Sequence, residues 1–209
     1  MPVVGKGIVR AVQSGDSLVL AKTGGKDAFE DTVYLAYITA PRCGNHQRSE
    51  EAFAFDAREF VRERLIGKKV DFTIEYIVKE RRYVTITCED SSINLMIVKA
   101  GLAKALEKKS NDPKFEAIAT ASEDCAKRKV GLWQTDPKFV EKHMRQVTYF
   151  GEADYNQTKL LEEANKEPKP LAAILEYVFG TNFVSLYVYK LKAVVKMQLV
   201  HLYTPKETD

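Results

Sequence analysis

The sequence predicts an α+β fold that is mainly β, with one complete domain followed by an incomplete second copy of it. Three observations lead to this prediction. Short β-rich runs separated by turn sequences fill much of the first 135 residues, helical periodicity appears in three places among them, and a motif from the third β-rich run returns near the C-terminus. With 209 residues, 45% of them hydrophobic, the chain has material for one full domain and a remainder.

The first three β-rich runs form a hairpin and a third strand. Residues 7–12 and 18–22 are apolar runs that flank a turn sequence, Ser-Gly-Asp, at 14–16. The third strand is expected over 32–38, before Pro41.

The middle of this domain combines a helix with a second hairpin. Over 50–66 apolar residues recur at helical spacing, and Gly67 provides a left-handed stop. The runs at 70–78 and 83–87 are rich in β-forming residues, and a charged turn at 79–82 separates them.

Two more helices complete the domain. Ser92 is a cap for a short helix that runs through Lys99, and Asp112 with Pro113 opens a third helix. The resulting order is strand, strand, strand, helix, strand, strand, helix, helix, which is that of an OB-type five-stranded Greek-key barrel with added helices. The expected buried stripe of the third helix is Phe115, Ile118, Ala119, Ser122 and Cys125.

The character of the sequence changes after Pro137. We expect a first domain over 1–137, a linker with a helix over 138–170, and the first strands of a truncated second domain over 171–209. Within the linker, a connector is expected up to residue 151 and a helix over 155–165.

The remainder repeats the opening of the first domain. β-rich runs occupy 174–178, 183–188 and 193–202, and QLVHLYTPK at 198–206 parallels YLAYITAPR at 34–42, with the same spacing of six residues from Leu to Pro. Because three strands cannot close a barrel, the sequence indicates either a piece of a longer protein or completion by another chain.

Composition restricts the class of protein. No stretch approaches the roughly 18 apolar residues of a membrane-spanning helix, and the N-terminus lacks the apolar core of a secretory signal. Cys43, Cys88 and Cys125 lie far apart without a CxxC motif or a neighbouring His pair, so neither a disulfide framework nor a zinc site is indicated. We therefore expect a reduced, intracellular compartment. The net charge is only +3, but its basic excess lies in residues 101–150.

These motifs resemble the staphylococcal-nuclease-like family, whose barrel begins with a Gly-Asp-Thr-Val hairpin and ends its third strand in Asp-Thr-Pro-Glu. Within it, AFDAREFVRERLIGKKVDFTIE at 54–75 resembles the first repeat of Tudor-staphylococcal-nuclease proteins, the p100 co-activator family. The resemblance covers a full first repeat over about 4–135 and the opening of a second. Proteins of that family carry several such repeats and a Tudor domain, so the chain is similar to an N-terminal piece.

The resemblance implies RNA handling. It implies binding of double-stranded or hairpin RNA, association with the RNA-induced silencing complex (RISC) in gene silencing, roles in RNA processing and transcriptional co-activation, and in some members RNA cleavage. The implied location is the cytoplasm, with the nucleus as a further one. Expected partners are RNA and the protein components of RNA-regulatory complexes, without a membrane.

The resemblance also allows the catalytic positions to be compared one by one. In the bacterial nucleases two aspartates and a threonine carbonyl hold Ca²⁺, and a glutamate activates water. Asp16 matches the first aspartate, whereas Thr39, Ala40 and Arg42 stand at the second aspartate, the threonine and the glutamate. Asp16 is therefore at most a vestigial Ca²⁺ ligand, and an ordinary turn residue is the alternative.

Two arginines clamp the phosphate in the bacterial enzymes. Tyr34 stands at the first of these positions, and Arg81 matches the second, with Arg82 as the alternative register. One carboxylate cannot make a dedicated site for an ion that takes about six to eight oxygen ligands, and loss of the general base alone costs about 10² to 10⁴ in rate. We therefore expect a catalytically impaired domain without a cofactor, and Ca²⁺ only if cleavage is retained. Rescue by Glu50 or Glu51 is conceivable, but carboxylates at a helix N-terminus have a simpler explanation.

Cations that replace carboxylates favour a phosphate backbone. Tyr34, Tyr37 and Tyr83 are candidates for base stacking near the cleft, with the core as the alternative. A solvated loop is likewise the alternative for Arg42 and Arg48. The candidate nucleic-acid-binding residues are Tyr34, Arg42, His46, Arg48, Arg81, Arg82, Lys108 and Lys109.

Three functional hypotheses remain open from the sequence. The first is an RNA-binding scaffold module, and the second is a calcium-dependent nuclease that cleaves RNA. The third is a protein-interaction module in which the open sheet at 171–209 recruits a partner strand or self-associates.

Overall fold

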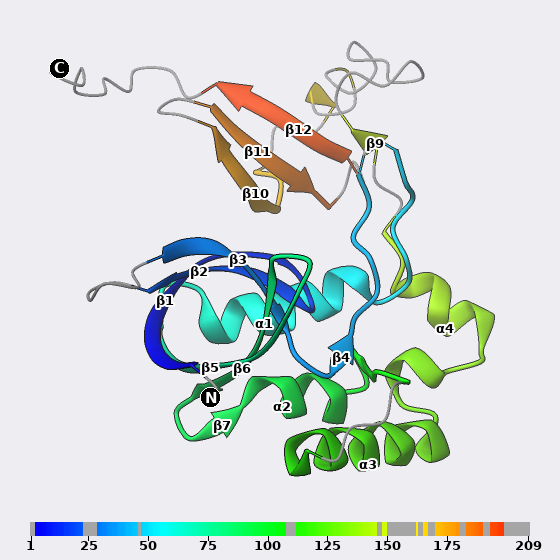
Figure 1. The fold of residues 1–209 in the computed structure, drawn as a ribbon. Coiled ribbons are helices and arrows are strands. Elements are labelled where there is room, and N and C mark those ends of the chain that lie inside the picture. Colours follow the sequence, from blue (N-terminus) through cyan, green and yellow to red (C-terminus); the bar gives the residue numbers. More distant parts are fainter. Residues whose placement is uncertain are drawn as a thin grey trace, which may run out of the picture. The chain divides into compact units, whose positions relative to one another are not determined.

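The computed structural model describes residues 3–22, 29–45, 47–107, 112–145, 148–149, 162, 165–166, 170–179, 183–189 and 193–198. The chain forms two compact units (Figure 1). The first, here called the barrel unit, comprises Met1–Cys43 and Glu51–Met144. The second, here called the sheet unit, comprises Gly44–Glu50 and Arg145–Asp209. No helix in the described part of the chain is long and apolar enough to cross a membrane.

Five strands close the barrel: β1 (Val3–Ser14), β2 (Ser17–Lys22), β3 (Phe29–Leu35), β5 (Lys69–Val78) and β6 (Arg81–Cys88). Antiparallel pairs join β3 to β2, β2 to β1, β1 to β5 and β5 to β6, and a parallel pairing of β3 with β6 completes the circle. This is the expected OB-type topology, and the mainly β, α+β fold is confirmed.

The predicted third strand is wrong in its bounds. It was expected to run through residue 38, but β3 ends at Leu35 because Tyr37 adopts a left-handed conformation with φ of 69°. The next two residues form a separate short strand, β4 (Ile38–Thr39), which pairs with β8 (Lys104–Ala105).

Helices surround the barrel and begin where the chain provides caps. Helix α2 (Ile93–Lys99) follows Ser92, whose Oγ accepts a hydrogen bond from the Leu95 N–H. Asp112 caps α3 (Pro113–Arg128) in the same way. Helix α1 (Ala54–Leu65) begins later than predicted, because Phe53 before it has φ of 66°. The remaining short elements of this unit are β7 (Ser91–Ser92), η1 (Gly131–Trp133) and α4 (Pro137–Lys142).

Helix α4 corrects the expectation of a connector over 138–151. Asp136 accepts a hydrogen bond from the Lys138 N–H, and Pro137 occupies the first turn, so the segment has the start signals of a helix. The helix expected over 155–165 lies largely outside the described residues.

The core fills the barrel interior and the inner faces of the helices. Inward positions alternate along each strand, and α1 and α2 contribute further apolar residues. Fully buried members are Val9, Leu18, Leu20, Val33, Leu35, Val61, Leu65, Phe72, Val84, Ile86 and Ile97. In α3, Phe115, Ile118 and Cys125 are buried as predicted, while Ala121 is buried in place of Ala119 and Ser122.

The sheet unit has four strands in the order β10, β11, β12, β9. These are β9 (Thr148–Tyr149), β10 (Ala173–Phe179), β11 (Phe183–Val188) and β12 (Ala193–Gln198). The pairs among β10, β11 and β12 are antiparallel, and β9 joins β12 in parallel. The strands expected at 174–178 and 183–188 are confirmed, and residues 199–202 of the third lie outside the described part.

Strand register shows that the internal repeat is structural. In β1 a bulge follows Val9, which pairs with Leu20; in β10 a bulge follows Leu175, which pairs with Leu186. The third strands match as well, because Val33 of β3 pairs with Leu18 while Met197 of β12 pairs with Val184. Two segments with the same bulge and the same registers are two copies of one three-stranded unit.

Candidate nucleic-acid interface

Three half-buried tyrosines lie side by side across three strands of the barrel: Tyr34 on β3, Tyr83 on β6 and Tyr76 on β5. The Tyr34 and Tyr83 ring centroids are 5.5 Å apart, and those of Tyr83 and Tyr76 are 4.8 Å apart with planes 22° from parallel. We call these three residues the tyrosine row. Because their neighbours Val33, Leu35 and Val84 are buried in the barrel, the row lies on its outer face.

Strand register explains how the row forms. Lys79 and Glu80 both have positive φ, so the β5–β6 hairpin turns on these two residues. This turn places Tyr76 opposite Tyr83, and the parallel β3–β6 pairing then places Tyr34 on the other side of Tyr83. Tyr76 was not predicted as a site residue. The sequence feature that could have identified Tyr76 is a two-residue turn at Lys79 and Glu80, because such a turn places Tyr76 opposite Tyr83.

Arginine side chains lie at the Tyr34 end of the row. The Arg81 guanidinium lies over the Tyr34 ring, 5.2 Å from its centroid, a cation–π arrangement on an exposed strand end. Arg82, the next residue, is paired with Asp31 through Nη1 and Oδ2 at 2.6 Å. Arg81 therefore presents its cation beside the row, whereas the charge of Arg82 is compensated.

Tyr37, which was predicted to be a stacking candidate, belongs to the core. Its side chain is 7% exposed, its ring packs against Tyr76 and Phe115, and its hydroxyl donates to Asp112 Oδ2 at 2.8 Å. Burial raises the pKa of Tyr37, and the hydrogen bond to Asp112 raises it further. The left-handed backbone at Tyr37 turns the side chain inward, which simple strand alternation does not anticipate.

Asp16 holds the first hairpin to the end of β4. Its Oδ1 accepts a hydrogen bond from Ser14 Oγ at 2.7 Å, and its Oδ2 accepts one from the Ala40 N–H at 2.9 Å. Its carbonyl accepts from the Leu35 N–H at 2.8 Å. Gly15 beside it has no room for a side chain, since a Cβ there would lie 2.6 Å from Ala57 Cβ. Both carboxylate oxygens of Asp16 thus accept hydrogen bonds that hold the hairpin turn to the end of β4.

Arg42 and Glu51, which lie in the segment between β4 and α1, are joined by two hydrogen bonds. The Arg42 N–H donates to Glu51 Oε2 at 2.8 Å, and the Glu51 N–H donates to the Arg42 carbonyl at 3.0 Å. The Glu51 carboxylate is therefore engaged with the backbone at the residue that stands in the glutamate position.

The residues present do not fit a Ca²⁺ ion. Asp16 uses both oxygens within the protein, Thr39 and Arg42 supply no carboxylate, and Glu51 is turned toward the Arg42 N–H. Among the residues that the structure describes, no group of three or more His, Cys, Asp or Glu side chains is arranged to hold a metal ion. The described residues therefore offer no ligand set for an ion that takes about six to eight oxygens.

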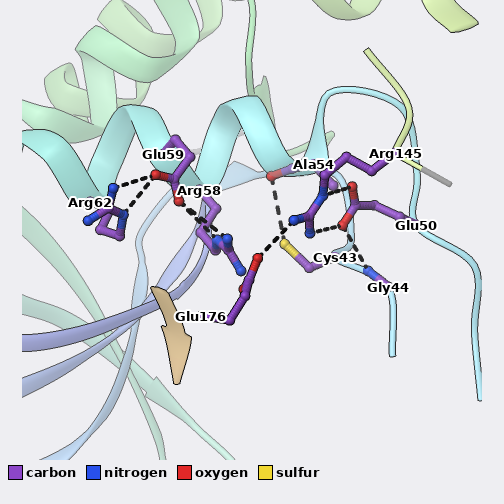
Figure 2. A network of polar contacts seen from close by, with 9 residues as sticks. All are labelled: Cys43, Gly44, Glu50, Ala54, Arg58, Glu59, Arg62, Arg145 and Glu176. Atoms are coloured by element: carbon purple, nitrogen blue, oxygen red, sulfur yellow. Dashed lines mark hydrogen bonds and ion pairs between the residues drawn. The ribbon is translucent and has the colours of Figure 1, made fainter. Parts of the chain in front are cut away.

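Both carboxylate oxygens of Glu50 are bound by Arg145 within the sheet unit (Figure 2). Arg145 donates from Nε and Nη2 to the two oxygens of Glu50 at 2.7 and 2.6 Å, and from Nη1 to Glu176 at 2.8 Å. The Glu50 side chain is 1% exposed and that of Arg145 is 11% exposed. The Arg145 guanidinium also lies over the Tyr187 ring, at 4.6 Å. Burial lowers the pKa of Arg145, but the two carboxylates outweigh it and raise the pKa overall.

The remaining predicted residues belong to different units or lie outside the described part of the chain. Arg48 lies in the sheet unit, where its backbone pairs with that of Asn45, while Arg42 and Arg81 lie in the barrel unit. Within the barrel unit the structure thus brings together Tyr34, Arg81 and Arg82. His46, Lys108 and Lys109 lie outside the described residues.

Replacing Asp16 by alanine is expected to destabilise the barrel unit by about 1 to 3 kcal/mol, because two hydrogen bonds to a carboxylate are lost. Urea unfolding followed by fluorescence of Trp133, the single tryptophan, measures this. Asp16→Asn, which keeps one acceptor, should lose less. If Ca²⁺ raised the unfolding midpoint of the unchanged protein and not of Asp16→Ala, Asp16 would be a metal ligand after all.

Comparison with known proteins gives the class of this domain. A family model described as staphylococcal nuclease homologue matches residues 32–135. Together with the closed barrel, this match defines a staphylococcal-nuclease-like domain.

Relatives narrow the class to one family. The chain is 28% identical to Ribonuclease TUDOR 1 of Arabidopsis thaliana over an alignment of 195 residues, and the match covers 87% of this chain and 20% of the relative. Ribonuclease TUDOR 2 of the same plant is 27% identical over 196 residues, with the same two shares. Staphylococcal nuclease domain-containing protein 1 of Schizosaccharomyces pombe is 28% identical over 135 residues, 60% of this chain and 15% of the relative. The chain belongs to the Tudor-staphylococcal-nuclease family and spans about a fifth of the length of these two plant relatives.

Proposed function

We propose that this chain is an RNA-binding scaffold module in which this repeat is catalytically impaired. The observation that carries the proposal is the tyrosine row with Arg81 at its end. Aromatic rings accept bases of any sequence by stacking, and an adjacent cation contacts the phosphate backbone. Relatives named ribonucleases support RNA as the ligand.

The geometry favours RNA with unpaired nucleotides. The bases of a duplex are stacked on each other and cannot lie on protein rings, whereas the loop of a hairpin presents unstacked bases. A hairpin loop would stack on Tyr34, Tyr83 and Tyr76, while Arg81 would contact phosphate. Lys79, exposed in the β5–β6 turn, is a further phosphate contact for the stem.

The proposal of impaired cleavage rests on the residues that stand at the catalytic positions of the bacterial nucleases. A phosphodiester is cleaved readily only when developing charge is neutralised and water is activated. Here Asp16 is held by Ser14 and Ala40, and Arg42 stands where a general base is needed. The second candidate function is a Ca²⁺-dependent ribonuclease, which the names of the plant relatives favour.

The proposed biological setting is that of the family: RNA silencing and processing, including RISC, and transcriptional co-activation. We propose a cytoplasmic and nuclear location, protein components of RNA-regulatory complexes as further partners, and no resident cofactor.

Hairpin RNA is expected to bind more tightly than a blunt duplex of the same stem, and Tyr34→Ala is expected to weaken hairpin binding by about 1 to 3 kcal/mol because one stacking ring is lost. Arg81→Ala should lower the slope of log K against log salt concentration by about 0.7 to 0.9, the share of one phosphate contact. Fluorescence anisotropy of labelled RNA across a salt series measures both.

Matched controls separate the row from general surface effects. Arg128→Ala removes an exposed arginine of α3, and Tyr189→Ala removes an exposed tyrosine of the sheet unit. If these weakened binding as much as Arg81→Ala and Tyr34→Ala, the row would not be the binding site. Recovered RNA is run on a denaturing gel with Ca²⁺ or EDTA. Fragments that form only with Ca²⁺ would establish the nuclease instead.

A further inference from the structure

A β-bulge in β5 turns Tyr76 onto the outer face of the barrel. Ile74 packs against the core, and strict alternation along β5 would send Tyr76, two residues later, inward as well. Ile74 pairs with Val84 of β6. The next pair joins Tyr76 to Tyr83, so Glu75 is an inserted residue without a partner in the ladder. Since a shift of one residue exchanges the two faces of a strand, this bulge gives the tyrosine row its third ring.

The bulge is held from helix α3. The Glu75 side chain is 7% exposed, and its Oε1 accepts hydrogen bonds from Thr85 Oγ1 of β6 and from Lys114 Nζ, the latter at 2.5 Å. A carboxylate this buried requires a cation and donors around it. Lys114 lies in the first turn of α3, where a cation is unfavourable to the helix dipole. The contact with Glu75, and not the stability of the helix, therefore explains its place.

A second contact holds the hydroxyl of Tyr76. This hydroxyl accepts a hydrogen bond from the Tyr37 N–H at 3.2 Å, and the Tyr37 ring packs edge-on against the Tyr76 ring with centroids 5.7 Å apart. Tyr37 donates from its own hydroxyl to Asp112 Oδ2, and Asp112 is the N-cap of α3. Both anchors of Tyr76 therefore lead to the first residues of α3.

We propose that Lys114 and Asp112 are positioning residues for the RNA-binding tyrosine row, although neither belongs to it. The inference rests on the proposed function, because it concerns the same row. A ring that stacks on a base is effective only when its own orientation is fixed by packing and hydrogen bonds. The Lys114 ammonium group is engaged by the Glu75 carboxylate, so Lys114 acts through Tyr76 and not by contact with phosphate.

Hairpin RNA binding by the full chain tests the role of Lys114. Lys114→Met is expected to weaken binding several-fold, while the slope of log K against log salt concentration stays unchanged because no phosphate contact is lost. Lys114→Arg, which keeps a long cation for Glu75, should restore most of the affinity. Lys127→Met, at an exposed lysine near the other end of α3, is the control and should bind as the unchanged chain does. A slope lowered by about 0.7 to 0.9 in Lys114→Met would make Lys114 a phosphate contact and overturn the proposal.

A double-mutant cycle separates positioning from general destabilisation. In the Tyr76→Ala background the ring is already absent, so Lys114→Met should weaken binding no further. In the Tyr34→Ala background it should weaken binding by nearly the same factor as in the unchanged chain. Equal losses in the two backgrounds would contradict the proposal, because Lys114 would then act elsewhere.

The second anchor has its own variant. Tyr37→Phe removes only the hydroxyl that donates to Asp112, and it should lower the affinity several-fold in the presence of Tyr76 and not in Tyr76→Ala. If Tyr34→Ala and Tyr76→Ala bind hairpin RNA as tightly as the unchanged chain, the row is not the binding site and both proposals are wrong. If those two variants lose affinity while Lys114→Met and Tyr37→Phe do not, the positioning role alone is wrong.

Discussion

Replacing Arg145 by methionine is expected to destabilise the sheet unit by about 3 to 5 kcal/mol, the cost of breaking a buried ion pair from one side. Methionine fills similar space but leaves Glu50 and Glu176, both nearly buried, as two carboxylates without their shared cation. Hydrogen exchange measured by mass spectrometry should show faster exchange in β10, β11 and residues 44–50, and little change in the barrel strands.

Two comparisons make this prediction specific. Arg128→Met removes an arginine whose pair with Asp124 is 58% exposed on both sides, and exposed pairs contribute about 0 to 1 kcal/mol. Adding Glu50→Gln and Glu176→Gln to Arg145→Met should restore part of the protection, because the buried negative charge disappears. Unchanged exchange in Arg145→Met would show that the three residues do not hold the unit together.

Replacing Asn94 by leucine is expected to cost the barrel unit about 2 to 6 kcal/mol, since a buried polar group left without a partner costs about 1 to 3 kcal/mol. Two groups are affected in this way, the Ile86 N–H and the Ala36 carbonyl, whereas the Val84 carbonyl keeps the hydrogen bond from the Ala36 N–H. Asn94 is 0% exposed. Its Nδ2 donates to the carbonyls of Ala36 and Val84, and its Oδ1 accepts from the Ile86 N–H, each at 3.0 Å. Urea unfolding with Trp133 fluorescence measures the loss.

The side chain of Asn94 takes the place of a strand. The pairing of β3 with β6 ends at Leu35 and Val84, so the next residues of β6 have no strand of the described part of the chain beside them on this side. The Asn94 side-chain amide donates to the Val84 carbonyl and accepts from the Ile86 N–H, as a backbone peptide of a neighbouring strand would. Gln13→Leu is the control, because its amide makes one exposed hydrogen bond to Thr32 at 3.3 Å. A loss below about 1 kcal/mol in Asn94→Leu would mean that water replaces the amide.

Local sequence patterns predicted the helices and strands better than they predicted the contacts between residues far apart in the chain. Caps and turn residues at Ser92 and Asp112 placed two helices correctly, because capping depends on a few neighbouring residues. The first hairpin followed from two apolar runs on either side of a turn sequence, although β1 extends beyond the predicted residues 7–12 at both ends. Bounds were wrong at Tyr37 and Phe53, where residues other than glycine adopt left-handed conformations that no residue pattern announces.

The candidate site was only partly predictable. Tyr34, Tyr83 and Arg81 were identified from the sequence, but Tyr76 depended on the register of a turn without glycine, asparagine or proline. Burial of Tyr37 depends on Asp112, 75 residues away, and the role of Glu50 depends on Arg145, 95 residues away. Glu50 was interpreted as a helix N-terminal carboxylate because its partner is not local.

The membership of Gly44–Glu50 in the sheet unit bears on how the chain folds as it is synthesised. Glu50 leaves the ribosome 95 residues before Arg145, and Glu176 follows Arg145 by 31 residues. All five barrel strands and α3 precede Arg145 in the chain, so the barrel can close before Glu50 has the guanidinium with which it pairs. The segment that contains Glu50 connects to Glu51 and Arg42 beside the Asp16 turn. A protein cut before Arg145 is therefore expected to close the barrel but to leave the Glu50 carboxylate without the cation that it has in the longer chain.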